Sequence, residues 1–342
     1  MIGGTTVAID GSKIRAVASR KAIATASQLR AQADRTAQEI SRYLAQLDEL
    51  DSQEGGGDAR AEDIKAALED LKKQEAVVAQ DLDSLGQSRR TMVVQTEPEA
   101  QVMRSLHGAP GYNLQTAVEA TSHLIVAHDV NAEASDQRQL QPMAQAAKAA
   151  LDKPCTVVAD AGYANGQQIA ALDEQGIKSF VAVNRAVNNQ GDGGLYDRTA
   201  FSYDASSDSF TCPAGQLLNR KQVSRTDNMV VYAASREDCA VCPNKPQCTK
   251  AAQRFISRHL YEDALQANAK RVDEQPEMMA LRRQTVEHPY GTIKHHILGN
   301  ARLLMRGIKG AQAELSLAVL AYNLKRAINM KGATWMRQAM QG

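Results

Sequence analysis

The pattern of apolar and polar positions along the chain first predicts a set of short strands. Residues 5–9 and 156–159 are brief runs of β-branched and other apolar residues, which are typical of buried strands. Residues 112–118 and 124–130 alternate around a polar turn, and this pattern predicts a β-hairpin. Residues 178–184 predict one further strand.

Helical patterns fill the intervals between these strands. An Ala-rich helix is expected at 137–151, and a second helix is expected at 166–176, with Asn165 as its cap and Gly176 at its end. The order is therefore strand, hairpin, helix, strand, helix, strand, which indicates an α/β fold class. After Tyr261 the pattern becomes helical and basic, and an apolar helix near residues 315–328 is expected to pack on the sheet.

Two long helical patterns lie between the first strand and the hairpin. Apolar residues recur in both at intervals of three and four, and a Gly-rich turn at residues 52–58 joins them. We expect an inserted antiparallel coiled-coil hairpin, which is either a solvated spacer or an arm that dimerises or clamps DNA. Its expected seam consists of Leu29, Ala33, Ala37, Ile40, Leu44 and Leu47 in the first helix and Ile64, Leu68, Leu71, Val78, Leu82 and Leu85 in the second.

Charge is distributed unevenly along the chain. The net charge of the 342 residues is only +1, but residues 34–83 hold fourteen acidic and six basic side chains, whereas residues 250–337 hold fifteen basic and seven acidic ones. The acidic segment cancels the basic one, so the net charge hides a candidate DNA-binding surface in the C-terminal part. No apolar run approaches the roughly 18 residues of a membrane span, and no secretion signal is recognisable.

Three carboxylates are the candidates for chemistry. Asp10 and Asp160 each follow a predicted strand directly, and Glu287 lies in a segment rich in basic residues. Carboxylates at strand ends suit a divalent-metal site for phosphoryl transfer, because Mg²⁺ takes a few carboxylate oxygens and the substrate phosphate supplies others. The simpler interpretation of Asp160 is that it caps the turn that follows.

Four of the five cysteines fall within one short region. A Cys-x2-Cys pair and two outlying cysteines could form a tetrahedral site of four thiolates that binds a structural zinc ion and holds a small module together. The alternative is that all five, Cys155 among them, are reduced thiols that act as small core residues. The candidate zinc ligands are Cys212, Cys239, Cys242 and Cys248.

Four segments of the chain resemble the DDE transposases of bacterial insertion sequences, a family with an RNase H-like catalytic core. They are residues 9–16, 111–118, 159–163 and 283–294. The last segment is similar to the family signature Tyr-x2-Arg-x3-Glu-x6-Lys, because Arg283, Glu287 and Lys294 fit its spacing, although Ala280 stands in the tyrosine position.

The resemblance implies a mixed RNase H-like sheet in which Asp10, Asp160 and Glu287 bind Mg²⁺ or Mn²⁺. It implies DNA strand cleavage and strand transfer at the ends of an insertion sequence, in the cytoplasm at the bacterial nucleoid. The expected partners are double-stranded DNA, at the transposon ends and at the target, and a second copy of the chain, and no membrane is involved. Phosphate contacts are expected from basic residues of the C-terminal part: Arg283, Lys294, Arg302 and Arg306.

The resemblance also suggests a division of the chain. We expect a first core strand with Asp10 at 1–19, the coiled-coil insertion at 20–95, the core with Asp160 at 96–187, the four-cysteine insertion at 188–262 and C-terminal core helices with Glu287 at 263–342.

Two alternatives to an active transposase stay open. One is an RNase H-like nuclease or resolvase that hydrolyses DNA without strand transfer, since the metal chemistry is shared. The other is an inactive, truncated transposase that acts as a DNA-binding or dimerising regulator. The second alternative arises because the chain begins almost on its first strand, whereas members of the family carry an upstream helical region that recognises transposon ends.

Overall fold

A computed structural model describes residues 2–52, 58–88, 90–182 and 194–339. Residues 53–57 of the predicted Gly-rich turn at 52–58 lie outside the described residues, and so do residues 187–193 of a Gly/Asn-rich linker that the sequence predicts at 187–194. The chain forms two compact units, and neither is continuous in sequence. The first unit is Met1–Asp10, Ala117–Ala127 and Ser135–Glu287, and the second is Gly11–Thr116, His128–Ala134 and His288–Gly342.

A six-stranded mixed sheet forms the centre of the α/β fold. Its strand order is β4-β5-β1-β7-β8, and β6 pairs with β5. Strand β7 is parallel to both β1 and β8, whereas β4 is antiparallel to β5. The strands are β1 (Thr6–Arg15), β4 (Gln101–Met103), β5 (Ala109–Glu119), β6 (Ile125–Asn131), β7 (Thr156–Ala159) and β8 (Lys178–Val181).

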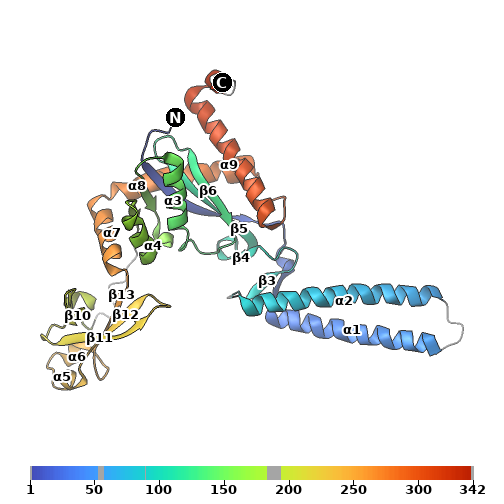
Figure 1. Cartoon of the computed structure of the whole chain (residues 1–342), viewed down its shortest axis with the longest axis horizontal. Coiled ribbons are helices and arrows are strands. Elements are labelled where there is room, and N and C mark those ends of the chain that lie inside the picture. The colour runs from blue at the N-terminus through green and yellow to red at the C-terminus, as the bar shows by residue number, and fades with distance from the viewer. Residues whose placement is uncertain (1, 53–57, 89, 183–193, 340–342) are drawn as a thin grey trace. The chain divides into compact units, whose positions relative to one another are not determined.

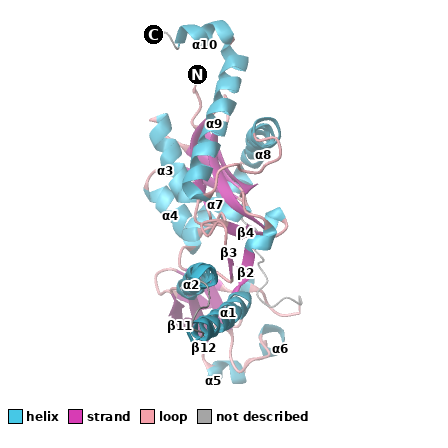
Figure 2. Ribbon diagram, turned by 90° about the vertical axis from the view of Figure 1, so that its right-hand side faces the viewer, coloured by secondary structure: helices cyan, strands magenta, loops and turns pink. Residues whose placement is uncertain are grey.

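In the first unit, helices cover both faces of this sheet (Figure 2). Side chains of β1 and β7 alternate between the faces, as successive strand residues must. Val7, Ile9 and Val157 pack against α3 (Leu140–Leu151) and α4 (Gly166–Glu174). Ala8 and Val158 point the other way and pack with Val286 of α8 (Glu277–Gly291).

Helix α7 (Glu262–Glu274) completes the edge of the sheet at β8. The Asn268 side chain accepts a hydrogen bond from the backbone N–H of Val181 (2.9 Å) and donates one to the carbonyl of the same residue (2.7 Å). Arg271 donates to the carbonyl of Ser179 (3.0 Å). The N–H and C=O of Val181 and the C=O of Ser179 at this edge are therefore paired with side chains, as buried backbone groups require.

The four-cysteine region contains a five-stranded antiparallel sheet that the sequence analysis did not predict. Its order is β13-β12-β11-β10-β9. It has a hydrophobic core of its own, formed by Phe201, Phe210, Leu218, Tyr232 and Ile256. The elements are η4 (Arg198–Ala200), β9 (Ser202–Asp204), β10 (Ser209–Thr211), β11 (Leu217–Ser224), β12 (Met229–Ala234), α5 (Arg236–Ala240), α6 (Lys245–Cys248) and β13 (Phe255–His259).

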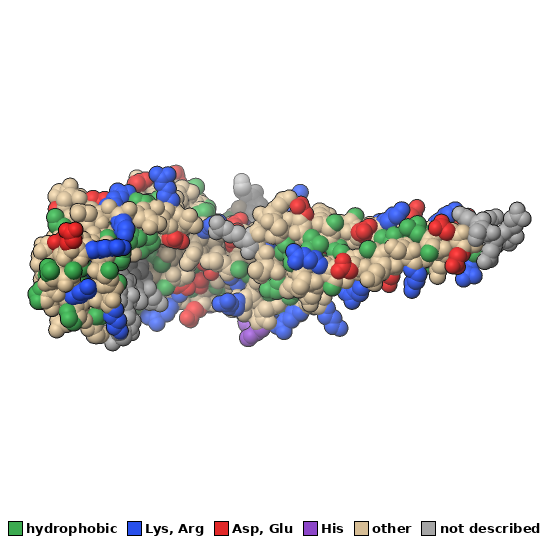
Figure 3. Space-filling model, turned by 90° about the horizontal axis from the view of Figure 1, so that it is seen from below, with side chains coloured by type: hydrophobic (Ala, Val, Ile, Leu, Met, Phe, Trp, Pro, Cys, Tyr) green, Lys and Arg blue, Asp and Glu red, His purple; other side chains and the backbone are tan. Residues whose placement is uncertain are grey.

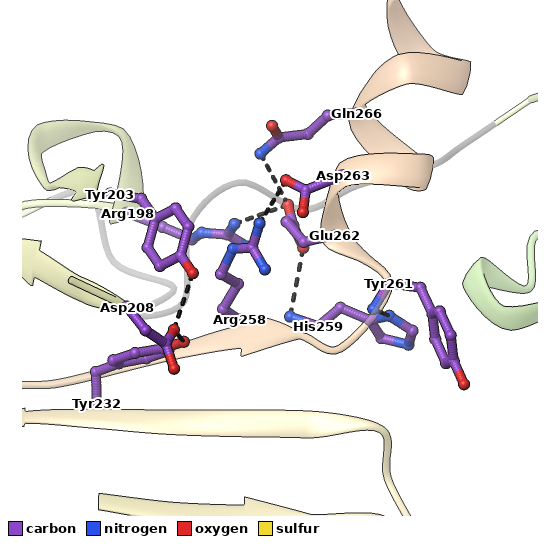
Figure 4. A network of polar contacts seen from close by, with 10 residues as sticks. All are labelled: Arg198, Tyr203, Asp208, Tyr232, Arg258, His259, Tyr261, Glu262, Asp263 and Gln266. Carbon is purple, nitrogen blue, oxygen red and sulfur yellow. Dashed lines mark hydrogen bonds and ion pairs between the residues drawn. The ribbon is translucent and has the colours of Figure 1, made fainter. Parts of the chain in front are cut away.

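A polar network joins this module to the first turn of α7 (Figure 4). Arg198 forms an ion pair of 2.7 Å with Glu262, whose side chain is only 2% exposed, and Arg258 pairs with Asp263. The guanidinium of Arg258 also lies 4.1 Å above the ring centre of Tyr203. Because α7 contacts both the module and β8, it connects the cysteine region to the central sheet.

In the second unit, two long helices lie side by side (Figure 1). They are α1 (Ala26–Ser52) and α2 (Asp58–Gln87), which at 1.5 Å per residue are about 40 Å and about 45 Å long. An apolar cluster of Leu29, Val78, Leu85 and Val93 packs at their base. There η1 (Arg20–Ala22) precedes β2 (Ile23–Thr25), which pairs with β3 (Met92–Val94).

The seam of α1 differs from the predicted one. Ala37 and Leu44 are exposed, whereas the neighbouring Thr36 is buried and Tyr43 is half-buried. Together with Leu29 these positions follow a seven-residue repeat, which keeps one face of the helix toward a partner helix, and Ala33, Ile40 and Leu47 of the predicted seam are half-buried beside them. Acidic and basic side chains are interspersed over the face of the helical hairpin that is visible in Figure 3.

The rest of the second unit is organised around Glu97, which is 2% exposed. Its carboxylate accepts hydrogen bonds from the hydroxyl of Tyr112 (2.9 Å) and from the backbone N–H groups of Ala18 (2.9 Å) and Gly307 (3.0 Å). The remaining elements are η2 (Arg104–Leu106), the π-helix η5 (Thr292–Ile297), α9 (Gly307–Lys331) and α10 (Ala333–Ala339). None of the described helices has the length and apolarity needed to cross a membrane.

Candidate active site

Asp10 and Asp160 occupy equivalent positions on neighbouring strands. The parallel register pairs Thr6 with Thr156 and Ala8 with Val158, so each aspartate lies two residues beyond a matched pair. Asp160 follows the last residue of β7, as predicted. Asp10 does not end its strand, because β1 continues to Arg15, and the predicted strand end at Asp10 was wrong.

One arginine nitrogen joins these two carboxylates. Nη2 of Arg282, on α8, lies 3.0 Å from Oδ2 of Asp10 and 3.2 Å from Oδ2 of Asp160. The side chains of Arg282 and Asp10 are 15% and 19% exposed, and that of Asp160 is 44% exposed. Arg282 reaches this place because it precedes Val286 by one helical turn, so both residues share the helix face that packs on the sheet.

Asp160 also caps the short helix η3 (Ala161–Tyr163). Its Oδ1 accepts a hydrogen bond of 2.9 Å from the backbone N–H of Gly162, while its Oδ2 contacts Arg282. Gly162 permits this approach, since a Cβ atom there would lie only 3.0 Å from Oδ1. The capping interpretation and the functional one are therefore compatible, because they use different oxygens of one carboxylate.

Glu287 is not drawn into this pair. It follows the buried Val286 on α8, and its own side chain is exposed, as is that of Arg283 one turn before it. Among the described residues, the Glu287 carboxylate forms no hydrogen bond or ion pair. No set of three or more His, Cys, Asp or Glu side chains in the described part of the chain is arranged to hold a metal ion.

The four candidate zinc ligands line one small cavity of about 20 Å³. Cys212 lies in a tight turn in which the backbone N–H of Gln216 points to its sulfur at 3.3 Å. Cys239 is on α5, Cys242 follows that helix and Cys248 ends α6. Burial raises the pKa of the Cys248 thiol.

A buried arginine borders the same cavity. Arg254 is 1% exposed, and its guanidinium donates to the carbonyls of Cys248 and Tyr196, each at 2.8 Å. Its Nε has no hydrogen-bond partner among the described residues, and burial lowers the pKa of the guanidinium. Cys155 lies apart in the core of the first unit, where burial raises its pKa to about 11.

The predicted phosphate-binding residues differ in their surroundings. Arg283, in the first unit, is exposed, and so is Arg306 just before α9 in the second. Lys294 is half-buried on η5. Arg302 donates from its guanidinium to the carbonyls of Ala16 and Val17, so part of its hydrogen-bonding capacity is used within the second unit.

The sequence analysis missed Arg282 as a site residue. It stands beside Arg283, which matches the signature and was therefore predicted as a site residue while Arg282 was not. The available signal was helical periodicity. A helix that buries Val286 against the sheet must present the residue four positions earlier to the same strands.

One comparison with known proteins identifies the family of this chain. No curated protein and no solved structure matches the chain. The family model described as "Transposase DDE domain" matches residues 97–324, which are 228 of the 342 residues. The match includes Asp160, Arg282 and Glu287 and begins after Asp10. This chain belongs to the DDE transposase family.

Proposed function

We propose that this chain is the catalytic region of an insertion-sequence transposase that cleaves DNA strands at the element's ends and joins them to target DNA. The observation that carries the proposal is the pair of aspartates held around one cationic nitrogen. The proposed partners are double-stranded DNA and a second copy of the chain. An RNase H-like core is supported by the strand order, with a hairpin on one side of β1 and two parallel strands on the other.

The aspartate pair suits a divalent cation. Oxygens of Asp10 and Asp160 approach one positive group from two strands, so Arg282 serves as a stand-in for a cation at this place. Hard oxygen donors are the ligands that Mg²⁺ and Mn²⁺ prefer. Glu287 is proposed as a third ligand on the motif that it shares with the family, and it would have to turn toward the pair.

The chain's own groups would orient the metal and the DNA. When bound, the metal ions would make water or a DNA 3′-hydroxyl more nucleophilic and neutralise charge on the phosphate. The Gly162 N–H fixes the orientation of the Asp160 carboxylate, and the strand register fixes Asp10 beside it. Arg283 and Lys294 are proposed to contact DNA phosphates, which positions the strand without reading its bases.

A strand-transfer assay tests this function against the nuclease alternative. The full chain, Mg²⁺ and a plasmid target are mixed with a duplex that ends in the inverted repeat flanking the coding sequence and carries a pre-cut 3′-hydroxyl. A transposase yields joined product, whereas a nuclease nicks the plasmid and joins nothing. A regulator binds the duplex and gives neither product.

The basic residues should set the salt dependence of DNA binding. Arg283→Ala combined with Lys294→Ala removes two predicted phosphate contacts, so the slope of log K against log salt should fall in magnitude by roughly 1.8. The control pair Lys65→Ala and Lys72→Ala makes the same charge change at exposed positions of α2. It should leave the slope unchanged, as measured by fluorescence anisotropy. A smaller salt slope in the control pair alone would show that DNA binds to the α1–α2 helical hairpin.

We also propose a structural zinc ion in the four-cysteine cavity. Support comes from the four cysteines around one cavity, from the N–H directed at the Cys212 sulfur and from Arg254, whose buried positive charge suits neighbouring thiolates. The sulfurs would have to move closer together around the ion.

Metal analysis should therefore find one zinc ion for each purified chain. Cys242→Ser should lose most of this zinc, because three thiolates hold it less tightly than four. Cys155→Ser should keep it, since Cys155 lies in a different core. Wild-type protein purified without chelators and free of zinc would refute the proposal.

A further inference from the structure

We propose that Arg282 is an internal counter-cation that holds Asp10 and Asp160 together while no metal is bound and that competes with the divalent metal for them. The inference rests on the proposed role of the two aspartates as metal ligands. It assigns to Arg282 a positioning role that the matched signature does not include, since the signature arginine is Arg283.

The need for a counter-cation follows from the strands. The register of β1 and β7 brings two carboxylates to one place, where like charges repel each other. The Asp10 side chain is only 19% exposed and is poorly screened by water. A single Nη2 atom contacts an oxygen of each aspartate and offsets the repulsion.

Arg282 nevertheless uses only part of its hydrogen-bonding capacity in this contact. Only Nη2 reaches the aspartates, and Nε of Arg282 is buried without a hydrogen-bond partner among the described residues. Arg271 in the same unit uses all of its guanidinium nitrogens. Its Nε donates to the Ser179 carbonyl, and both terminal nitrogens donate to Asp173. Arginines that hold a structure permanently favour such forked pairing. Arg282 is therefore the more readily displaced of the two.

Competition follows from shared atoms. The oxygens that Arg282 contacts are Oδ2 of both aspartates, while Oδ1 of Asp160 is occupied by the Gly162 N–H. A divalent ion bound between the aspartates needs the same oxygens and repels the guanidinium at short range. The metal and the Arg282 head group cannot occupy this place together, so Arg282 must move away when the metal enters.

The test measures Mn²⁺ affinity of the full chain by titration with EPR detection, together with the melting temperature in EDTA and in saturating Mn²⁺. Arg282→Gln should tighten Mn²⁺ binding by about tenfold, within the usual range for coupled sites. It should also lower the melting temperature in EDTA and recover most of that loss in Mn²⁺. Arg282→Lys keeps the charge and should bind Mn²⁺ nearly as the wild type does.

Arg271→Gln is the matched control. It removes a similarly buried arginine that pairs with an aspartate, so it should lower the melting temperature in both conditions and leave Mn²⁺ affinity unchanged. Unchanged or weakened Mn²⁺ binding in Arg282→Gln, with binding lost in Asp160→Asn, would overturn the role of Arg282 alone. Equal Mn²⁺ binding by the wild type and Asp160→Asn would overturn the proposed metal site and the competition with it.

Discussion

Asp160→Ala is expected to lower Mg²⁺-dependent DNA cleavage by about a thousandfold or more. A metal ligand contributes several kcal/mol to transition-state stabilisation, and each 1.36 kcal/mol corresponds to a factor of ten in rate. Asp160→Asn should be equally inactive but better folded, because an amide oxygen can still accept the hydrogen bond from Gly162. Cleavage of a labelled duplex and a thermal melt, run on the same preparations, separate the two effects.

The control for this prediction is Asp129, an exposed carboxylate on β6 that accepts a hydrogen bond from the Asn131 side chain. Asp129→Ala should retain cleavage within about a factor of two, since surface substitutions of this kind change stability by less than about 0.5 kcal/mol. Mg²⁺-dependent cleavage that survives in Asp160→Ala would rule out Asp160 as a metal ligand.

Glu97→Ala should destabilise the protein by about 4 kcal/mol. The substitution removes one buried carboxylate and leaves three donors without a partner: the Tyr112 hydroxyl and the N–H groups of Ala18 and Gly307. Each buried donor left unsatisfied costs about 1–3 kcal/mol. Water can replace the lost carboxylate at the Gly307 N–H, which is only partly buried, so the total stays near the lower end of the sum. Urea unfolding at neutral pH measures the change.

Glu99→Ala is the comparison for this substitution. Glu99 also accepts a hydrogen bond at the start of α9, from the N–H of Ile308 at 2.9 Å, but that contact is exposed. Its loss should cost about 1 kcal/mol or less, as for other helix caps. An equal loss of unfolding free energy in Glu97→Ala and Glu99→Ala would show that the burial of Glu97 does not determine its contribution to stability.

Local patterns predicted the parts of the core that depend on local chemistry. The run at 156–159 is strand β7 with the same bounds, and the caps at Asp160 and Asn165 are both formed. The end of β1 was missed for a physical reason. Pairing partners on both sides decide how far a central strand runs, and Gly11 and Ser12, which suggest a turn locally, lie inside it.

Two features depended on tertiary structure that no local pattern reveals. The sheet at 202–259 consists of short strands interrupted by cysteine turns, and its strand Met229–Ala234 is apolar throughout, so the alternation of burial seen in the structure is not visible in the sequence. The Arg282 bridge requires α8 to cross β1 and β7 at one particular height, which is set by the packing of Val286 on Ala8 and Val158. Sequence spacing identifies Glu287 and Arg283 by their motif, but not the arginine that reaches the aspartates.

The pairing of α7 with β8 also bears on aggregation. An open sheet edge presents unpaired N–H and C=O groups that can recruit a strand from another molecule and start an ordered aggregate. At β8 three of these groups are already paired, because both backbone groups of Val181 bind Asn268 and the carbonyl of Ser179 accepts from Arg271. Another chain can extend the sheet on this side only by displacing α7, which is itself anchored through Glu262 to the neighbouring module. The helix thus protects the sheet that carries Asp160 from edge-to-edge association.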